Sequence, residues 1–150
     1  MSENQNEQIE VESYPQIEPC LETIGCIYIP VKDPYEAAHW YIKNFGLVIA
    51  GYSRPLIPGK DVVSLRTVSG PNLFLIQTSE TKTMGFLNKD GFHQPAVCFF
   101  VKDIVSIFER LKENNVRFAD EELKDRGSCG VEFAIFDPDG NKFVLSQQGG

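Results

Sequence analysis

The sequence predicts an α+β fold in which one βαβββ unit is used twice. Two apolar, strand-like stretches, 24–33 and 94–103, begin 70 positions apart, and each ends in the same Val-Lys-Asp triplet. A helix-like segment follows each triplet, and further strand-like runs follow each helix. The order of these elements predicts the internal repeat, because few residues are identical between the two copies.

The first unit is predicted over residues 24–78. Its opening segment, 24–31, is apolar and rich in β-branched residues, which favours a buried strand. Asp33 is the predicted N-cap of a helix that has Pro34 at its first position and runs to about Asn44. Three strands then follow, separated by turns that contain Pro and Gly, over residues 45–52, 61–69 and 73–78.

A polar linker, 79–93, leads to the second unit, which is predicted over residues 94–148. Asp103 is the predicted N-cap of its helix, which ends near residues 114–115. The stretch Asp137-Pro138-Asp139-Gly140 has the residue preferences of a type I turn. Strands are expected over residues 96–101, 116–119, 131–136 and 142–147.

Composition indicates one domain and excludes several classes of partner. A chain of 150 residues with 42% hydrophobic content suits a single core, predicted over residues 24–150 after a tail, 1–23. The first 22 residues hold six glutamates and no Lys or Arg, whereas the rest has 15 acids and 14 bases. We therefore expect an acidic tail with little fixed structure and a body without a basic stripe for nucleic acid. No apolar run reaches the roughly 18 residues of a membrane span and no secretory signal is seen, which favours a soluble, cytoplasmic protein.

Three motifs carry a resemblance to a known family: Ile29-Pro30-Val31-Lys32-Asp33, Phe99-Phe100-Val101-Lys102-Asp103, and Phe136-Asp137-Pro138-Asp139-Gly140-Asn141-Lys142-Phe143. Over about residues 24–148 the chain resembles the vicinal oxygen chelate superfamily of glyoxalases, bleomycin-resistance proteins and extradiol dioxygenases. The resemblance implies a curved mixed sheet around a cup, a glyoxalase-like fold. It also implies a homodimer, and in metal-dependent members a divalent ion held by His or Glu on the first and last strands of each unit.

The usual metal site is expected to be absent. Carried over residue by residue, the four ligand positions fall on Cys26, Leu75, Ala96 and Val144, with Asn72 aligned to Asn141 at an offset of 69. None of the four is His, Asp or Glu, and a lone thiol cannot supply the donors that a divalent cation needs. The resemblance therefore implies neither a metal ion nor another cofactor at this position.

The cup lining implied by the resemblance, together with alternation along the first strand of each unit, is apolar with one phenol, and it consists of Cys26, Tyr28, Leu75, Ala96, Cys98, Phe100 and Val144. Arg66 and Glu132 are candidate charged anchors on neighbouring strands, and their facing depends on the hairpins. If residues 137–140 form a three-residue hairpin with a bulge, Glu132 joins the cup, and the corresponding register in the first unit turns Arg66 outward. Such a surface suits a small organic molecule, or is filled by its own side chains. The four cysteines lack CxxC spacing and are expected to be reduced, and Cys26 and Cys98 to act as small apolar side chains.

Three functions remain open. The favoured hypothesis is a metal-free homodimer that binds a small organic molecule, similar in type to the bleomycin-resistance proteins. The second is a lyase, isomerase or dioxygenase of the same superfamily with a displaced metal site built from Cys26, His93 and a carboxylate such as Glu132. The third is a protein-interaction or regulatory module that uses its sheet edges and acidic tail. The other histidine, His39, lies mid-helix and is expected to pack or to face solvent.

Overall fold

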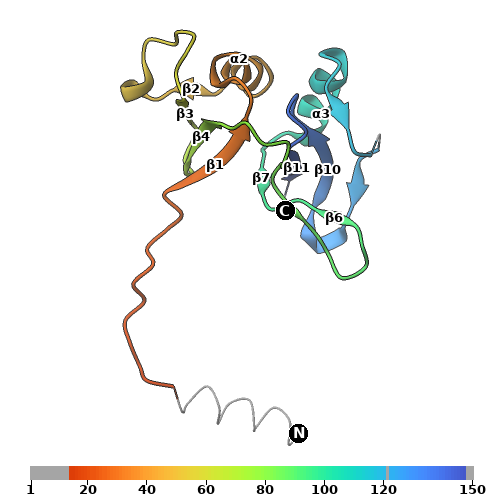
Figure 1. Ribbon diagram of the computed structural model, residues 1–150. Coiled ribbons are helices and arrows are strands. Elements are labelled where there is room, and N and C mark those ends of the chain that lie inside the picture. Colours follow the sequence, from red (N-terminus) through yellow and green to blue (C-terminus); the bar gives the residue numbers. More distant parts are fainter. Residues whose placement is uncertain (1–13, 121, 148–150) are drawn as a thin grey trace, which may run out of the picture.

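The predicted α+β fold is confirmed in a computed structural model, which describes residues 14–120 and 122–147 (Figure 1). The first half contains β1 (Cys26–Val31), α2 (Pro34–Phe45), β2 (Val48–Ile49), the 3-10 turn η1 (Gly51–Ser53), β3 (Val62–Arg66) and β4 (Asn72–Gln77). A hairpin of β5 (Phe86–Leu87) and β6 (His93–Gln94) follows. The second half contains β7 (Cys98–Phe100), α3 (Ile104–Glu113), β8 (Arg117–Phe118), β9 (Lys124–Asp125), the 3-10 turn η2 (Gly127–Cys129), β10 (Val131–Phe136) and β11 (Lys142–Gln147).

Each half of the chain builds its own sheet on the same plan. The first sheet, with α2, is called module one and has the strand order β1-β4-β3-β2. The second, with α3, is called module two and has the order β7-β11-β10-β8, with β9 also on β10. Tyr28 pairs with Phe74 in parallel, and Cys98 pairs with Val144 in parallel, so both partners lie 70 residues further on in module two. The repeat seen in the sequence is therefore a repeat of strand register.

Each helix begins at its predicted aspartate cap. The Asp33 carboxylate accepts a hydrogen bond from the Tyr35 backbone N–H at 3.0 Å, and Asp103 accepts from Ser106 N–H at 3.2 Å. Helix α2 ends at Gly46, whose φ of +65° is left-handed and costs glycine little because it has no Cβ. Both helices pack on one face of the sheets, α2 on β3 and β4 and α3 on β11 (Figure 1).

The hydrophobic core lies between the helices and the sheets and runs through both modules. Alternate strand residues face it, as a strand's side-chain period of two requires. In module one these are Ile29, Val31, Val63, Leu65, Leu73 and Leu75, and in module two Phe133, Ile135, Phe143 and Leu145. The residues between them face the side of each sheet that α2 and α3 leave uncovered. We call this second side the open face.

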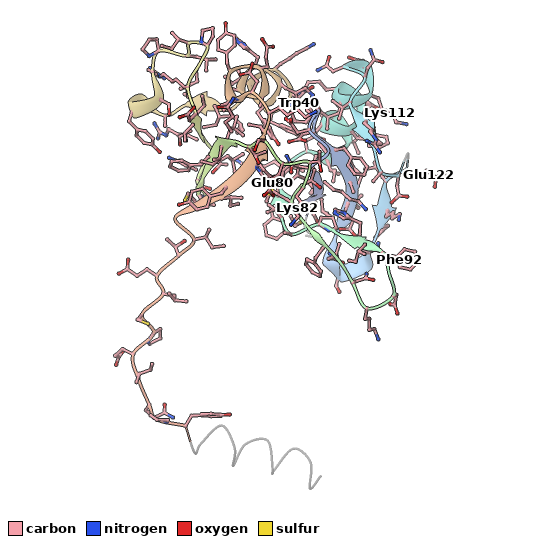
Figure 2. The ribbon with its side chains drawn as sticks, viewed as in Figure 1. Trp40, Glu80, Lys82, Phe92, Lys112 and Glu122 are labelled. Atoms are coloured by element: carbon pink, nitrogen blue, oxygen red, sulfur yellow. The ribbon has the colours of Figure 1, made fainter. Side chains whose placement is uncertain are left out.

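Three segments differ from their predictions. The strand expected over 45–52 is reduced to β2, because α2 continues through Phe45, which packs against Trp40, and residues 51–53 form η1. The linker 79–93 contains the β5–β6 hairpin, whose turn is held by the Asn88 side chain, and Figure 2 shows Phe92 on it. The strand expected from residue 96 begins at Cys98.

The two modules are joined by the hairpin between β10 and β11. Asp137 is 3% exposed and accepts the Tyr41 hydroxyl at 2.6 Å and the Asn141 side-chain amide at 2.8 Å. Asn141 is fully buried, donates to the Pro30 carbonyl at 2.9 Å and accepts from the Met84 N–H at 3.0 Å. Since buried polar groups are costly unless they are paired, this satisfied network fixes module two against β1 and α2 of module one.

Replacing Tyr41 with phenylalanine is expected to remove part of the protein's sensitivity to alkali. Burial, and then the charge of Asp137, raise the pKa of Tyr41 well above its ordinary value of 10.0. The unfolded chain therefore ionises this phenol above about pH 10 while the folded chain does not, which lowers the free energy of unfolding by about 1.4 kcal/mol per pH unit. Urea unfolding of both proteins from pH 8 to 11 measures this. The advantage of the wild type over the variant should shrink above pH 10, and a constant difference contradicts the assignment.

An arm of residues 14–25 extends from the start of β1 without helix or strand (Figure 1). Its apolar side chains Tyr14, Ile17 and Leu21 are exposed. Most of the predicted acidic tail, residues 1–13, lies outside the described residues. Neither described helix is long and apolar enough to cross a membrane.

Candidate functional site

The open face of module one carries an aromatic cluster. The ring centroids of Tyr28 and Phe74 are 5.8 Å apart, and Tyr52 stacks on Phe74 at 6.2 Å with 25° between the planes. The Tyr52 hydroxyl lies 2.8 Å from the Ser64 hydroxyl and accepts from the Asn72 side-chain amide at 3.1 Å, which fixes its ring over the sheet. Tyr28 is nevertheless 65% exposed and Tyr52 68% exposed. The cluster therefore presents oriented aromatic surface to solvent.

Tyr52 is one of the site residues that the sequence prediction missed. The sequence predicts Tyr52 at the end of a strand, whereas it lies in the 3-10 turn η1, outside the sheet. Its ring stacks on Phe74 of β4. Gly51 before it and Pro55 after it are turn signals. Such signals locate a turn but do not show which face of a neighbouring sheet its side chains cover, so strand alternation could not find this residue.

The open face of module two brings together four of the predicted residues. Val144 pairs with Cys98, and Ser146 pairs with both Phe100 and Glu132, so these side chains share one face. Phe100 is 69% exposed. The Glu132 carboxylate accepts from the Arg126 guanidinium at 2.6 Å. Ala96 is exposed and lies two residues before β7, outside the strand in which it was predicted.

The prediction that Leu75 lines the cup is wrong. Leu75 pairs with Ile29, and both side chains are fully buried in the core. The cause is the offset of 69 used to align Asn72 with Asn141, since the strand registers repeat at 70. A one-residue slip moves a strand side chain to the opposite face. At the correct register Phe74 is the counterpart of Val144, and it lies on the open face.

The sequence left the facing of Arg66 open, and the outward facing expected with a bulged hairpin is not observed. Leu65 points into the core, so its neighbour Arg66 lies on the open face of β3, where the β3–β4 register places it beside Asn72. The Asp137–Gly140 turn closes with a bond from Gly140 N–H to the Asp137 carbonyl at 3.0 Å, with Gly140 at φ +92°. This places Glu132 on the open face as predicted. The same register holds in module one, where it places Arg66 on that face too.

The predicted site residues form two groups in the chain. Cys26 and Tyr28 lie on the open face of module one, and Cys98, Phe100, Glu132 and Val144 on that of module two. The first strands, β1 and β7, are each the outermost strand of their own sheet and do not pair with each other in the described residues. A groove of about 690 Å³ lies elsewhere, between α2, β2 and the loop after η1, and contains none of the predicted site residues.

The thiol of Cys98 is not activated by its surroundings. Partial burial raises its pKa, and the nearby negative charge of Glu132 raises it further. A thiolate is the nucleophilic form, and it requires a lowered pKa beside a cation. At neutral pH Cys98 is therefore a protonated, weakly polar side chain, and it is exposed rather than buried in the core.

The residues at the usual metal positions do not fit a metal ion. At the corrected register these positions hold Cys26, Phe74, Ala96 and Val144, which offer one soft donor and no oxygen or imidazole. Across residues 14–120 and 122–147, no three His, Cys, Asp or Glu side chains converge, so Cys26, His93 and Glu132 do not form the displaced site in one chain. His39 is exposed on α2 and contacts Tyr35 edge-on at 4.7 Å.

Several solved structures share this architecture. TnmS3, an antibiotic binding protein from Streptomyces sp. CB03234, is 19% identical, with a TM-score of 0.65 over 88% of this chain and 100% of that one. Lactoylglutathione lyase from Agrobacterium tumefaciens is 18% identical, with a TM-score of 0.62 over 86% and 96%. The fosfomycin resistance protein FosX from Listeria monocytogenes is 14% identical, with a TM-score of 0.63 over 86% and 95%. These likenesses concern the fold, which serves both binding proteins and enzymes.

Comparison of the sequence with protein families identifies the family of the chain. No match was found among curated protein sequences. The family model of the Glyoxalase/Bleomycin resistance protein/Dioxygenase superfamily matches residues 23–145, which span both modules and the hairpin that joins them. This chain therefore belongs to the Glyoxalase/Bleomycin resistance protein/Dioxygenase superfamily.

Proposed function

We propose that this protein binds a small organic molecule through aromatic contacts on its open faces, without a metal ion, and that two copies of the chain pair to complete the site. The exposure of Tyr28, Tyr52 and Phe100, between 65% and 69% each, is the observation that carries this proposal. Large aromatic side chains exposed on the open face of each sheet mark surfaces that another molecule covers. The likeness to an antibiotic binding protein supports the same role.

The unpaired edges of the two sheets support the pairing of two copies of the chain. β1 and β7 are edge strands of their sheets, so each has one row of backbone N–H and C=O groups without a strand partner in the described chain. A second copy related by a two-fold axis can place its β7 beside β1 and its β1 beside β7, which covers both edges at once. The open face of module one would then meet the open face of the partner's module two, and the ligand would lie between them.

N-phenyl-1-naphthylamine, a neutral aromatic fluorophore, tests the proposed binding site. Its emission is expected to rise and to saturate with the wild-type protein. Tyr28→Ala and Tyr52→Ala should each weaken binding about threefold to tenfold, as loss of one aromatic contact predicts. Tyr35→Ala is the matched control, because Tyr35 lies on α2 beside His39, away from the open face. Trp40, also on α2 (Figure 2), serves as an internal reporter of folding.

Equal binding by all four proteins, or no saturable binding, contradicts the assignment to the open face. Metal analysis of protein purified without chelator distinguishes the enzyme hypothesis, which requires one metal ion per chain. Removal of residues 1–22 distinguishes the interaction-module hypothesis, which requires that partner capture be lost while probe binding is retained. Native mass spectrometry then reports whether the protein is a dimer and whether a small organic molecule remains bound to it.

A further inference from the structure

The open faces are cationic although the chain as a whole carries a net charge of −7. Strand alternation and pairing place four cationic side chains on them, namely Arg66, Arg117, Lys124 and Lys142. One carboxylate, Glu132, shares these faces within the described strands. The acidity of the chain therefore comes from elsewhere, mainly from the glutamates of the first 22 residues.

Three of these four cations form no ion pair with the described residues. Glu132 is already held by Arg126 at 2.6 Å, and Lys124 is paired with Asp120 at 2.8 Å. Arg117 lies over the Phe136 ring at 4.2 Å. Lys142 lies 5.9 Å from the same ring and donates to the His93 carbonyl at 3.4 Å, and its charge helps to lower the pKa of Asp120. Arg66 is exposed and forms no ion pair with any described residue. Within the described strands of the open faces, Arg66, Arg117 and Lys142 therefore form no ion pair, whereas the one carboxylate is already paired.

Arg66 is the cation nearest the aromatic cluster in the strand pairing. It follows Ser64 by two residues on β3, and the β3–β4 register places it beside Asn72. Ser64 and Asn72 are the two residues that hold the Tyr52 hydroxyl. The guanidinium is a planar fork of donors that matches a carboxylate, and it belongs to the same surface as the stacked rings. One flat molecule can therefore lie on the rings and direct an acidic group toward Arg66.

We propose that the ligand is an aromatic anion whose ring stacks on Tyr28, Phe74 and Tyr52 and whose acidic group binds Arg66. This inference rests on the proposed function, because it names the class of molecule that binds to the same open face of module one. It also excludes cationic aromatic molecules as preferred ligands, since the cations of both modules repel them and Glu132, the one carboxylate that the described strands place on the open faces, is already paired. The charges of module two extend the same preference to the partner face.

Three naphthalene derivatives of one size test this charge preference by displacing N-phenyl-1-naphthylamine from the full-length protein. 2-Naphthoate is expected to bind at least about tenfold more tightly than neutral 2-naphthamide, the gain of one charge-assisted hydrogen-bonded pair. 2-Naphthylmethylammonium should bind more weakly than the amide. The advantage of the naphthoate should also fall as salt is raised from 50 to 500 mM, because exposed charges are screened.

Arg66→Gln should remove most of the advantage of naphthoate over naphthamide while leaving the amide's affinity within about twofold. The substitution is mild, because the Arg66 side chain is exposed and unpaired in the fold. Arg54→Gln is the matched control, since Arg54 is also an exposed arginine of module one but bonds to the Ile49 carbonyl at 3.3 Å, beside the groove. It should leave the preference intact.

The outcomes separate this inference from the function beneath it. Tyrosine-dependent binding of N-phenyl-1-naphthylamine with equal affinity for all three naphthalenes overturns the anion preference and leaves the binding function standing. Preference for the ammonium compound overturns the inference in the opposite direction. Equal loss of naphthoate binding in the Arg66→Gln and Arg54→Gln variants shows a general charge effect and overturns the role assigned to Arg66. Absence of any probe binding overturns both proposals.

Discussion

Replacing Asp137 with alanine is expected to lower the free energy of unfolding by about 3–5 kcal/mol. The Asp137 carboxylate accepts four hydrogen bonds, from the Tyr41 hydroxyl, the side-chain amide and backbone N–H of Asn141, and the Asp139 N–H. Tyr41 and Asn141 are buried, so alanine leaves at least two buried donors without an acceptor, each costing roughly 1–3 kcal/mol. Urea unfolding at pH 7 measures the loss. Because this network joins the modules, their cooperative unfolding should weaken as well.

Thr67→Ala provides the control, since Thr67 occupies the equivalent turn of module one. Its hydroxyl accepts from Gly70 N–H at 3.0 Å and donates to the Pro71 carbonyl at 3.1 Å, both within the turn. Thr67 does not reach the other module, and its loss should cost about 1 kcal/mol or less. Similar losses from the two substitutions contradict the view that the module-two hairpin joins the halves of the molecule.

The fold was predictable because its signals are local and repeated. Asp33 and Asp103 each follow a strand-like run, and each caps a helix in the structure. A capping carboxylate competes for the first free N–H groups of a helix whatever the rest of the chain does, so it can be read from a short stretch. The strands of each module follow from alternation between core and solvent, which is also local.

The site was harder to predict because it depends on register. Leu75 and Phe74 are neighbours, both apolar and both in β4, and composition does not show which one faces the helices. An offset of 69 instead of 70 was enough to choose the wrong one. The facing of Arg66 could not be decided from the sequence for the same reason, since it follows from the pairing of β3 with β4. Tyr52 depends on the path of a turn, which no periodicity describes.

The relation between the modules could not be read from either repeat. The sequence of each repeat predicts the sheet of that repeat alone. The hydrogen bonds from Asn141 to Pro30 and from Tyr41 to Asp137, in contrast, join residues about a hundred positions apart. Thr67 and Pro71 occupy the corresponding places in module one and make only local bonds. The turn of module two therefore forms hydrogen bonds with module one, whereas the equivalent turn of module one bonds only within itself. The sequence pattern that predicts the fold does not show this difference.

Mixing two defective variants is expected to restore binding sites that neither variant has alone. One chain carries Tyr28→Ala and Tyr52→Ala, which remove the aromatic surface of module one. The other carries Val144→Lys, which places a charged side chain in the middle of the open face of module two, opposite Cys98. If each site combines module one of one copy with module two of the other, a mixed dimer contains one site with both damaged faces and one site with neither.

Chains unfolded in urea, combined in equal amounts and refolded together should recover about a quarter of the wild-type capacity for N-phenyl-1-naphthylamine. Random pairing makes half of the dimers mixed, and one of the two sites in each mixed dimer is intact, as two-fold symmetry requires. The recovered sites should have wild-type affinity, because no residue in them is changed. Each variant refolded alone is the control, and wild-type protein treated in the same way sets the full capacity. No recovery, with both variants folded, means that the modules act within one chain and that pairing through β1 and β7 does not build the site.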